Sequence, residues 1–314
     1  MSRTLTLLAA LAWAGAFSAS AAYPERPVKL VVPWAAGGDT DVVYRAFQPH
    51  LQKHLGSTVV IANVGGASGT KGAKETKDSA ADGYTIVAIH DSIHSTYYTG
   101  VADVAWSDFQ PICLVASTPS ILTAAPKTPW KDAKAMLADA KARPGQVTVG
   151  ASLGSTSHFF PALVEKAAGV KFKYVSYEGT APRMNALLGS HIDMAESNLT
   201  QKGKADAGQM RFLAIATEKR NPDAPNVPTL KELGVDVVYS VNRGLMAPKA
   251  TPADVMAKLQ SACAAAAKEP AFAAAMTSQG TLVNFLGPKE YAGFLKDNDK
   301  LNHDLAKDLG LLKR

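Results

Sequence analysis

Three features are scarce in this sequence, and each scarcity excludes a class of protein. No basic run is interleaved with aromatic residues, which make up 7% of the chain, so we do not expect a nucleic-acid partner. After residue 22 no apolar run is long enough to cross a membrane. No cysteine follows the small residues at positions 19–22, which argues against a bacterial lipid anchor. The net charge of +6 attracts an anionic ligand only slightly.

The two cysteines leave their pairing open. Cys113 lies in an apolar run over residues 111–116, and Cys263 lies in an alanine-rich segment that is predicted to be helical. An exported protein can pair its cysteines, whereas buried cysteines of this kind also occur as unpaired thiols. Both outcomes remain possible from the sequence.

The first 22 residues have the composition of a secretory signal peptide. Arg3 supplies a positive charge, residues 5–17 are apolar but too short to span a bilayer, and small residues follow. Cleavage after Ala21 or after Ala22 fits equally well. We therefore expect an exported protein that is soluble in the periplasm.

A glycine turn between a strand and a helix organises the start of the mature chain. Residues 28–32 are a continuous apolar run, typical of a buried parallel strand. Gly37 and Gly38 follow, and then apolar residues recur every four positions along one helical face, at Val43, Phe47, Leu51 and Leu55. Such a turn presents unpaired N–H groups and the positive end of a helix dipole to an anion. Asp39 is placed to cap this helix. The alternative is a tight turn with no ligand.

Strand and helix segments alternate along most of the chain. The pattern predicts strands near residues 59–62, 84–89, 111–116, 121–125, 147–150, 172–175, 192–195, 212–216 and 244–247, with a helical tail from Thr251. Repeated strand–helix–strand units predict an α/β fold with parallel sheets covered by helices on both faces. The chain is long enough for two domains. Ligands on such sheets bind at the carboxyl ends of the strands, where the Gly/Ser turns lie.

Other patterns suggest alternative chemistry. Residues 150–154 fit the G-x-S-x-G nucleophile elbow, which favours a secreted serine hydrolase acting through Ser152, with Asp193 or Asp236 and His303 as partners. However, no HGGG-type oxyanion segment precedes it, and His303 lies in a charged terminal helix. Residues 65–72 differ from a phosphate loop, and no Glu lies between His50 and His54 as in a zinc motif. We expect no cofactor and no metal.

The ordered set of motifs resembles one family, the substrate-binding proteins of tripartite tricarboxylate transporters, also called Bug or TctC proteins. Residues 32–41, V-P-W-A-A-G-G-D-T-D, are similar to the family's P-F-x-P-G-G-x-x-D, and residues 63–72, N-V-G-G-A-S-G-T-K-G, to its N-R-P-G-A-G-G-x-x-G. The resemblance continues with D-G-Y-T at 82–85, S-L-G-S with His158, Y-E-G-T-A-P at 177–182, N-V-P-T at 226–229 and G-L-M-A-P at 244–248. It covers nearly the whole mature chain.

The resemblance implies a two-lobed periplasmic binding protein (Venus flytrap, type II-like) with parallel-rich sheets. It implies no enzymatic activity and a ligand that is a di- or tricarboxylate or an aromatic carboxylate. The partner is the membrane permease of the transporter or, as an alternative, a membrane sensor kinase. We expect a monomer, with lobe 1 at residues 23–120 plus 243–314 and lobe 2 at 121–242.

The resemblance and the turns together give the expected binding residues. Backbone N–H groups of two glycine loops in lobe 1 hold the acid, and two turns of lobe 2 face them. The expected set is Trp34, Gly37, Gly38, Asp39, Asp41, Gly66, Ala67, Ser68, Gly69, His90, Ser92, Ser152, Gly154, Ser155, Thr156, Gly179, Thr180 and Arg243.

The sequence departs from the family pattern at three places. Ala36 replaces the proline of the first loop, Val64-Gly65 replaces Arg-Pro in the second, and Asn242-Arg243 stands where many members have aromatic residues. Arg243 either grips a second carboxylate of the ligand in a bidentate manner or points to solvent.

Overall fold

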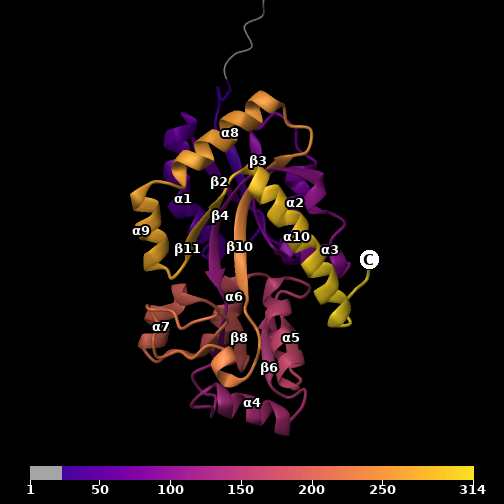
Figure 1. Ribbon diagram of the computed structural model, residues 1–314, viewed down its shortest axis with the longest axis vertical. Helices are drawn as coiled ribbons and strands as arrows, with labels where there is room; N and C mark the ends of the chain where they lie inside the picture. The colour runs from indigo at the N-terminus through magenta and orange to yellow at the C-terminus, as the bar shows by residue number, and fades with distance from the viewer. Residues whose placement is uncertain (1–22) are drawn as a thin grey trace, which may run out of the picture.

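A computed structural model describes residues 23–314, which form two β-sheets, each with helices on both faces (Figure 1). The predicted signal peptide lies outside the described residues. The observed class is the predicted α/β class. The chain passes from one sheet to the other after Pro119 and returns at Ser240.

The first sheet has six strands in the order β11-β4-β10-β3-β1-β2. Strand β1 is parallel to β2 and β3, whereas β10 runs antiparallel to both β3 and β4. The strands are β1 (Val28–Val32), β2 (Val59–Asn63), β3 (Thr85–His90), β4 (Phe109–Pro119), β10 (Ser240–Pro248) and β11 (Leu282–Leu286).

Alternation along β1 divides the core of this sheet in two. Leu30 and Val32 belong to a buried cluster with helices α1, α8 and α9, while Val31 belongs to a second cluster with α2, α3 and α10. The helices are α1 (Asp39–Leu55), α2 (Thr70–Lys77), α3 (Ser92–Tyr98), α8 (Ala253–Ala266), α9 (Pro270–Ser278) and α10 (Pro288–Asp308).

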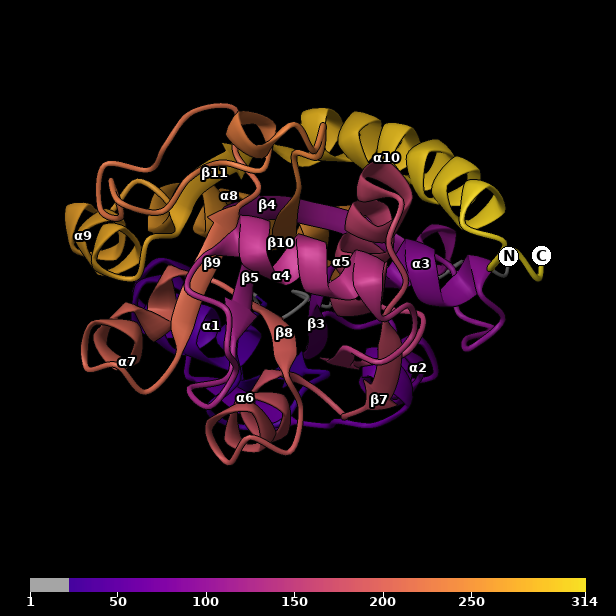
Figure 2. The same ribbon diagram turned by 90° about the horizontal axis from the view of Figure 1, so that it is seen from below.

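The second sheet has five strands in the order β7-β6-β8-β5-β9. They are β5 (Ile121–Ala124), β6 (Thr148–Ala151), β7 (Lys173–Ser176), β8 (Met194–Ser197) and β9 (Arg211–Ile215), with helices α4 (Ala133–Ala142), α5 (Thr156–Ala168), α6 (Thr180–Leu188) and α7 (Lys202–Asp206). Figure 2 shows α5 beside the end of α10, where Lys166 pairs with Asp308 at 2.8 Å.

Both sheets are mixed: each has three parallel strands on one side, as predicted, and antiparallel strands complete it. Strand β5 is antiparallel to β8 and β9, and β10 is antiparallel to its two neighbours. The chain enters the second sheet through β5 and returns to the first sheet through β10. Each of these strands therefore runs opposite to its two neighbours. The expected helical tail is also interrupted by β11, a short apolar strand between glycines.

The glycine turn after β1 leads into α1 as predicted, but the helix is capped differently. Gly38 occupies the N-cap position, and Asp39 is the first helical residue rather than the cap. The helix ends at Gly56, whose φ of 79° is the left-handed conformation that glycine tolerates. The Asp39 carboxylate is therefore available for contacts outside its own helix.

A disulfide joins Cys113 of β4 to Cys263 of α8, with the two Cα atoms 6.6 Å apart. Both residues are fully buried in the cluster beneath α1 and α8. The bridge closes a span of 150 residues that includes the whole second sheet. It therefore fixes the two ends of the excursion through that sheet.

Replacing both cysteines by alanine should lower the free energy of unfolding by about 2–4 kcal/mol, because the bridge restricts the unfolded chain. Urea unfolding of the two proteins measures the difference. A reducing agent should destabilise the wild type and leave the double variant unchanged. Free thiols in the denatured, unreduced wild type would contradict the assignment.

Candidate functional site

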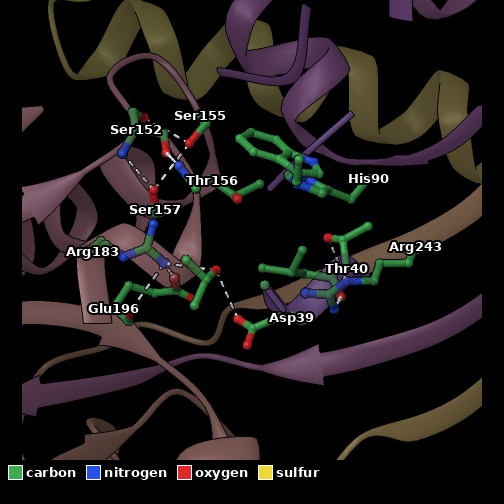
Figure 3. Close-up of a pocket in the computed structure, with 15 residues that line it drawn as sticks. Asp39, Thr40, His90, Ser152, Ser155, Thr156, Ser157, Arg183, Glu196 and Arg243 are labelled. Carbon is green, nitrogen blue, oxygen red and sulfur yellow. Dashed lines mark hydrogen bonds and ion pairs between the residues drawn. The ribbon is translucent and has the colours of Figure 1, made fainter. Parts of the chain in front are cut away.

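A small cavity of about 30 Å³ lies between the two sheets (Figure 3). Strands and turns of both sheets contribute to its wall. The lining residues are Trp34, Gly38, Asp39, Thr40, His90, Ser152, Ser155, Thr156, Ser157, Gly179, Thr180, Arg183, Glu196, Val241 and Arg243.

Three helices begin at this cavity. Asp39 is the first residue of α1, Thr156 of α5 and Thr180 of α6, and all three line the wall. The first N–H groups of a helix have no partner within the helix, and the helix dipole places partial positive charge there. Partial positive charge therefore faces the cavity at three places, and at α1 the Asp39 carboxylate offsets it.

The Ser152 hydroxyl ties the two turns of the second sheet together. It donates a hydrogen bond to the Tyr177 carbonyl at 2.7 Å and accepts one from the Gly179 N–H at 3.0 Å. No histidine of residues 23–314 hydrogen-bonds to it. The serine hydrolase hypothesis requires a histidine that takes the Ser152 proton. Its candidate, His303, instead contacts Asp304 on α10. This geometry gives Ser152 a structural task.

One ion pair in the wall is buried and internal. Arg183 of α6 donates to the Glu196 carboxylate of β8 at 2.7 Å, and both side chains are at most 5% exposed. Ser120 also donates to Glu196. Within the described residues, the Arg183 Nε–H has no hydrogen-bond acceptor.

Arg243 of β10 is a buried cation without a carboxylate partner. The residue is 2% exposed, which excludes the solvent-facing orientation. Its guanidinium donates to the Thr40 hydroxyl at 3.2 Å, the Thr118 hydroxyl at 2.7 Å and the Val241 carbonyl at 3.3 Å. Between residues 23 and 314, no carboxylate lies within ion-pair distance of it.

Asp39 is a buried carboxylate that connects the two sheets across the cavity (Figure 3). It is 7% exposed and accepts hydrogen bonds from Thr180 at 3.1 Å, Asn198 at 2.7 Å and Thr200 at 3.2 Å. All three donors are neutral and belong to the second sheet's side. Asp39 forms no ion pair with any residue that the structure describes.

Trp34 and His90 form an aromatic part of the wall. Their rings stack with centroids 4.8 Å apart. Burial, with smaller contributions from the Arg243 and Arg183 charges, holds the pKa of His90 well below its usual range, so the ring is neutral. The Trp34 indole N–H is buried and unpartnered among residues 23–314.

The N–H groups expected to bind the ligand are largely used within the chain. The Gly37 N–H donates to the Asp41 carboxylate at 2.8 Å, and the Ser68 N–H donates to the Glu178 carboxylate at 2.9 Å. Gly69 packs on the Trp34 ring, which a Cβ would meet at 2.7 Å. The second glycine loop thus supports the wall from outside and contacts Glu178, in the turn between β7 and α6.

The structure brings together ten of the expected residues and not the other eight. Around the cavity lie Trp34, Gly38, Asp39, His90, Ser152, Ser155, Thr156, Gly179, Thr180 and Arg243. Outside its wall lie Gly37, Asp41, Gly66, Ala67, Ser68, Gly69, Ser92 and Gly154. Sequence reasoning missed Thr40, Ser157, Arg183, Glu196 and Val241. An acidic residue inside the short, fully buried strand β8 was one available signal.

In residues 23–314, no helix is both long and apolar enough to cross a membrane. The same residues contain no group of three or more His, Cys, Asp or Glu side chains placed to hold a metal ion.

Comparison of sequences connects the chain with known proteins. The family described as "Tripartite tricarboxylate transporter family receptor" matches residues 43–311. Protein BugT of Bordetella pertussis is 32% identical over 282 residues, which are 88% of this chain and 86% of BugT.

Solved structures agree with this match. The periplasmic binding protein BugD superposes with a TM-score of 0.88 at 32% identity, over 93% of this chain and 100% of that one. MatC of Rhodopseudomonas palustris, solved with bound malate, gives a TM-score of 0.84 at 28% identity over 90% of this chain and 99% of that one. An R. palustris protein solved with adipate gives 0.86 at 29% identity, over 92% and 99%.

His158 of α5 should make stability depend on pH. Its Nδ1 accepts from the Gly154 N–H at 3.2 Å, and burial lowers its pKa to about 4. An unfolded histidine titrates near pH 6.5, so protons favour the unfolded chain as the pH falls from about 6.5 to about 4. Between pH 7.5 and pH 5 this should remove roughly 2 kcal/mol of stability.

The substitution His158→Gln should reduce that loss, as measured by urea unfolding at the two pH values. A residual slope of the same sign is expected from His90. The control is His303→Gln, on the half-exposed surface of α10. Equal pH dependence in wild type and His158→Gln would show that His158 does not carry the effect.

Proposed function

Because the chain belongs to the tripartite tricarboxylate transporter receptor family, the periplasmic solute-binding proteins of these transporters, we propose that it captures a small organic carboxylate between its lobes. It then delivers the ligand to the membrane permease of such a transporter. In this proposal the protein is a monomer in the periplasm, exported by a signal peptide cleaved after Ala21 or Ala22. It performs no chemistry on the ligand.

The observation that carries this proposal is the buried, unpaired guanidinium of Arg243. Removing a charge from water costs several kcal/mol unless a partner compensates it. The neutral oxygens of Thr40, Thr118 and Val241 satisfy only part of its donor capacity. A carboxylate entering the cavity supplies the missing charge and can accept two parallel hydrogen bonds from the planar guanidinium.

The remaining wall also supplies donors. The N-termini of α1, α5 and α6 face the cavity, and two lining residues, Trp34 and Arg183, each have an N–H without an acceptor in the described chain. Donors of this kind are matched by carboxylate, hydroxyl and carbonyl oxygens of a small acid. The malate and adipate present in two similar structures are small acids of this kind.

The proposal divides the protein into two lobes that close on the ligand. Lobe 1 comprises residues 23–120 and 243–314, and lobe 2 comprises residues 121–242, so each contains one sheet except for the first residues of β10. Asp39 and Ser68 of lobe 1 both hydrogen-bond to residues of lobe 2. A ligand that contacts both lobes stabilises this closed arrangement by its affinity for it.

Arg243→Met should weaken binding of the preferred acid by about 1.5–3 kcal/mol, the contribution of a charge-assisted hydrogen bond. Methionine keeps most of the apolar stem and removes the guanidinium. A thermal-shift screen of carboxylic acids identifies the acid, and calorimetry measures its affinity for each variant. The matched control is Arg143→Met at the C-cap of α4, where the side chain is half-exposed, pairs with Asp139 and does not line the cavity, and it should bind normally. Equal affinity for wild type and Arg243→Met would rule out this role for Arg243.

Ser152 should not react as a nucleophile. Its hydroxyl proton is directed at the Tyr177 carbonyl, and no base is in contact with it in residues 23–314. Incubation with a fluorophosphonate probe should therefore give no covalent adduct by mass spectrometry. Labelling that disappears in Ser152→Ala would instead support the serine hydrolase.

A further inference from the structure

The cavity contains one cation and one anion that lack a charged partner. Among its lining residues, Arg183 and Glu196 pair with each other at 2.7 Å. Arg243 and Asp39 remain, and each contacts only neutral groups of the described chain. Both are buried, at 2% and 7% exposure. A ligand that satisfies both needs a negative group for Arg243 and a positive group for Asp39.

Asp39 has capacity for one more donor. A carboxylate offers about four acceptor positions, and Thr180, Asn198 and Thr200 occupy three. Its position as first residue of α1 adds the favourable dipole of that helix. The Asp39 carboxylate itself carries the negative charge at this end of the cavity, so it repels a ligand carboxylate from the first glycine loop. The carboxylate is thereby directed to Arg243 and to the N-terminus of α5.

The overall charge of the cavity points the same way. Its wall holds two arginines and two carboxylates, and burial keeps His90 neutral. A plain dicarboxylate would place one charge on Arg243 and leave its second charge, like that of Asp39, without a cationic partner in this buried space. A molecule with a carboxylate and an ammonium group leaves no buried charge unpaired.

Building on the proposed function, we propose that the ligand is an amino-carboxylate, whose carboxylate binds Arg243 and whose ammonium group donates to Asp39. Asp39 then has two tasks, since it also accepts the hydrogen bonds that hold lobe 2 against lobe 1. The Asp39 charge selects ligands that carry an ammonium group. The hydrogen bonds of Asp39 to lobe 2 stabilise the closed arrangement with any ligand. These two tasks can be separated by experiment.

Calorimetry on matched pairs tests the assignment: 4-aminobutyrate with butyrate, β-alanine with propionate, and L-glutamate with glutarate. The members of a pair differ by the ammonium group alone. For at least one pair, wild type should bind the amino acid tenfold or more tightly than the plain acid. Asp39→Asn keeps the shape and removes the charge, and should reduce this preference to less than threefold. Thr200→Val removes one hydrogen bond between the lobes, leaves the charge, and should weaken both members equally.

Three results would overturn the assignment. The first is a wild type that prefers plain acids or binds both members equally, a result that needs no variant. The second is an Asp39→Asn protein that keeps the full preference. The third is binding of other carboxylates while every amino acid of the panel fails. If no carboxylate of any kind binds, the proposed function fails together with this inference.

Discussion

Arg243 on β10 imposes the constraint on which the site depends, because a buried guanidinium requires a negative partner. The chain supplies it with two hydroxyl groups and one carbonyl, but no described carboxylate approaches it. Its position follows from the fold, since β10 lies between β3 and β4 and places Arg243 beside His90 in register. The strand that returns the chain to the first sheet thus carries the unsatisfied cation to the junction of the two sheets.

The rest of the wall is arranged so that it does not satisfy this charge itself. Glu196 is held by Arg183 and Ser120, Asp41 by Gly37 and Arg45, and Glu178 by the Ser68 N–H. Asp39, the remaining carboxylate of the cavity wall, is engaged by three neutral donors of the second sheet's side. Every other acid nearby therefore has a local task. Such a wall is prepared for a ligand before the ligand enters, which lowers the cost of binding.

Part of this structure could be predicted from the sequence. The alternating apolar runs and glycine turns gave the α/β class and helix α1, and the ordered motifs identified the family correctly. The antiparallel directions of β5 and β10 could not be predicted, because local patterns carry no information about which distant strands become neighbours. The pairing of Cys113 with Cys263 could not be predicted for the same reason, because the two residues are 150 positions apart in the sequence. The glycine loops looked like anion sites, but the carboxylates of Asp41 and Glu178 occupy N–H groups there, and only tertiary structure shows this.

The most direct test of the account is a crystal structure of the protein grown with the carboxylic acid that stabilises it most. The account predicts a ligand carboxylate between the two sheets, with an oxygen about 2.7–3.2 Å from the Arg243 guanidinium. A ligand bound in this cavity without contact to Arg243, or bound elsewhere on the molecule, would contradict it.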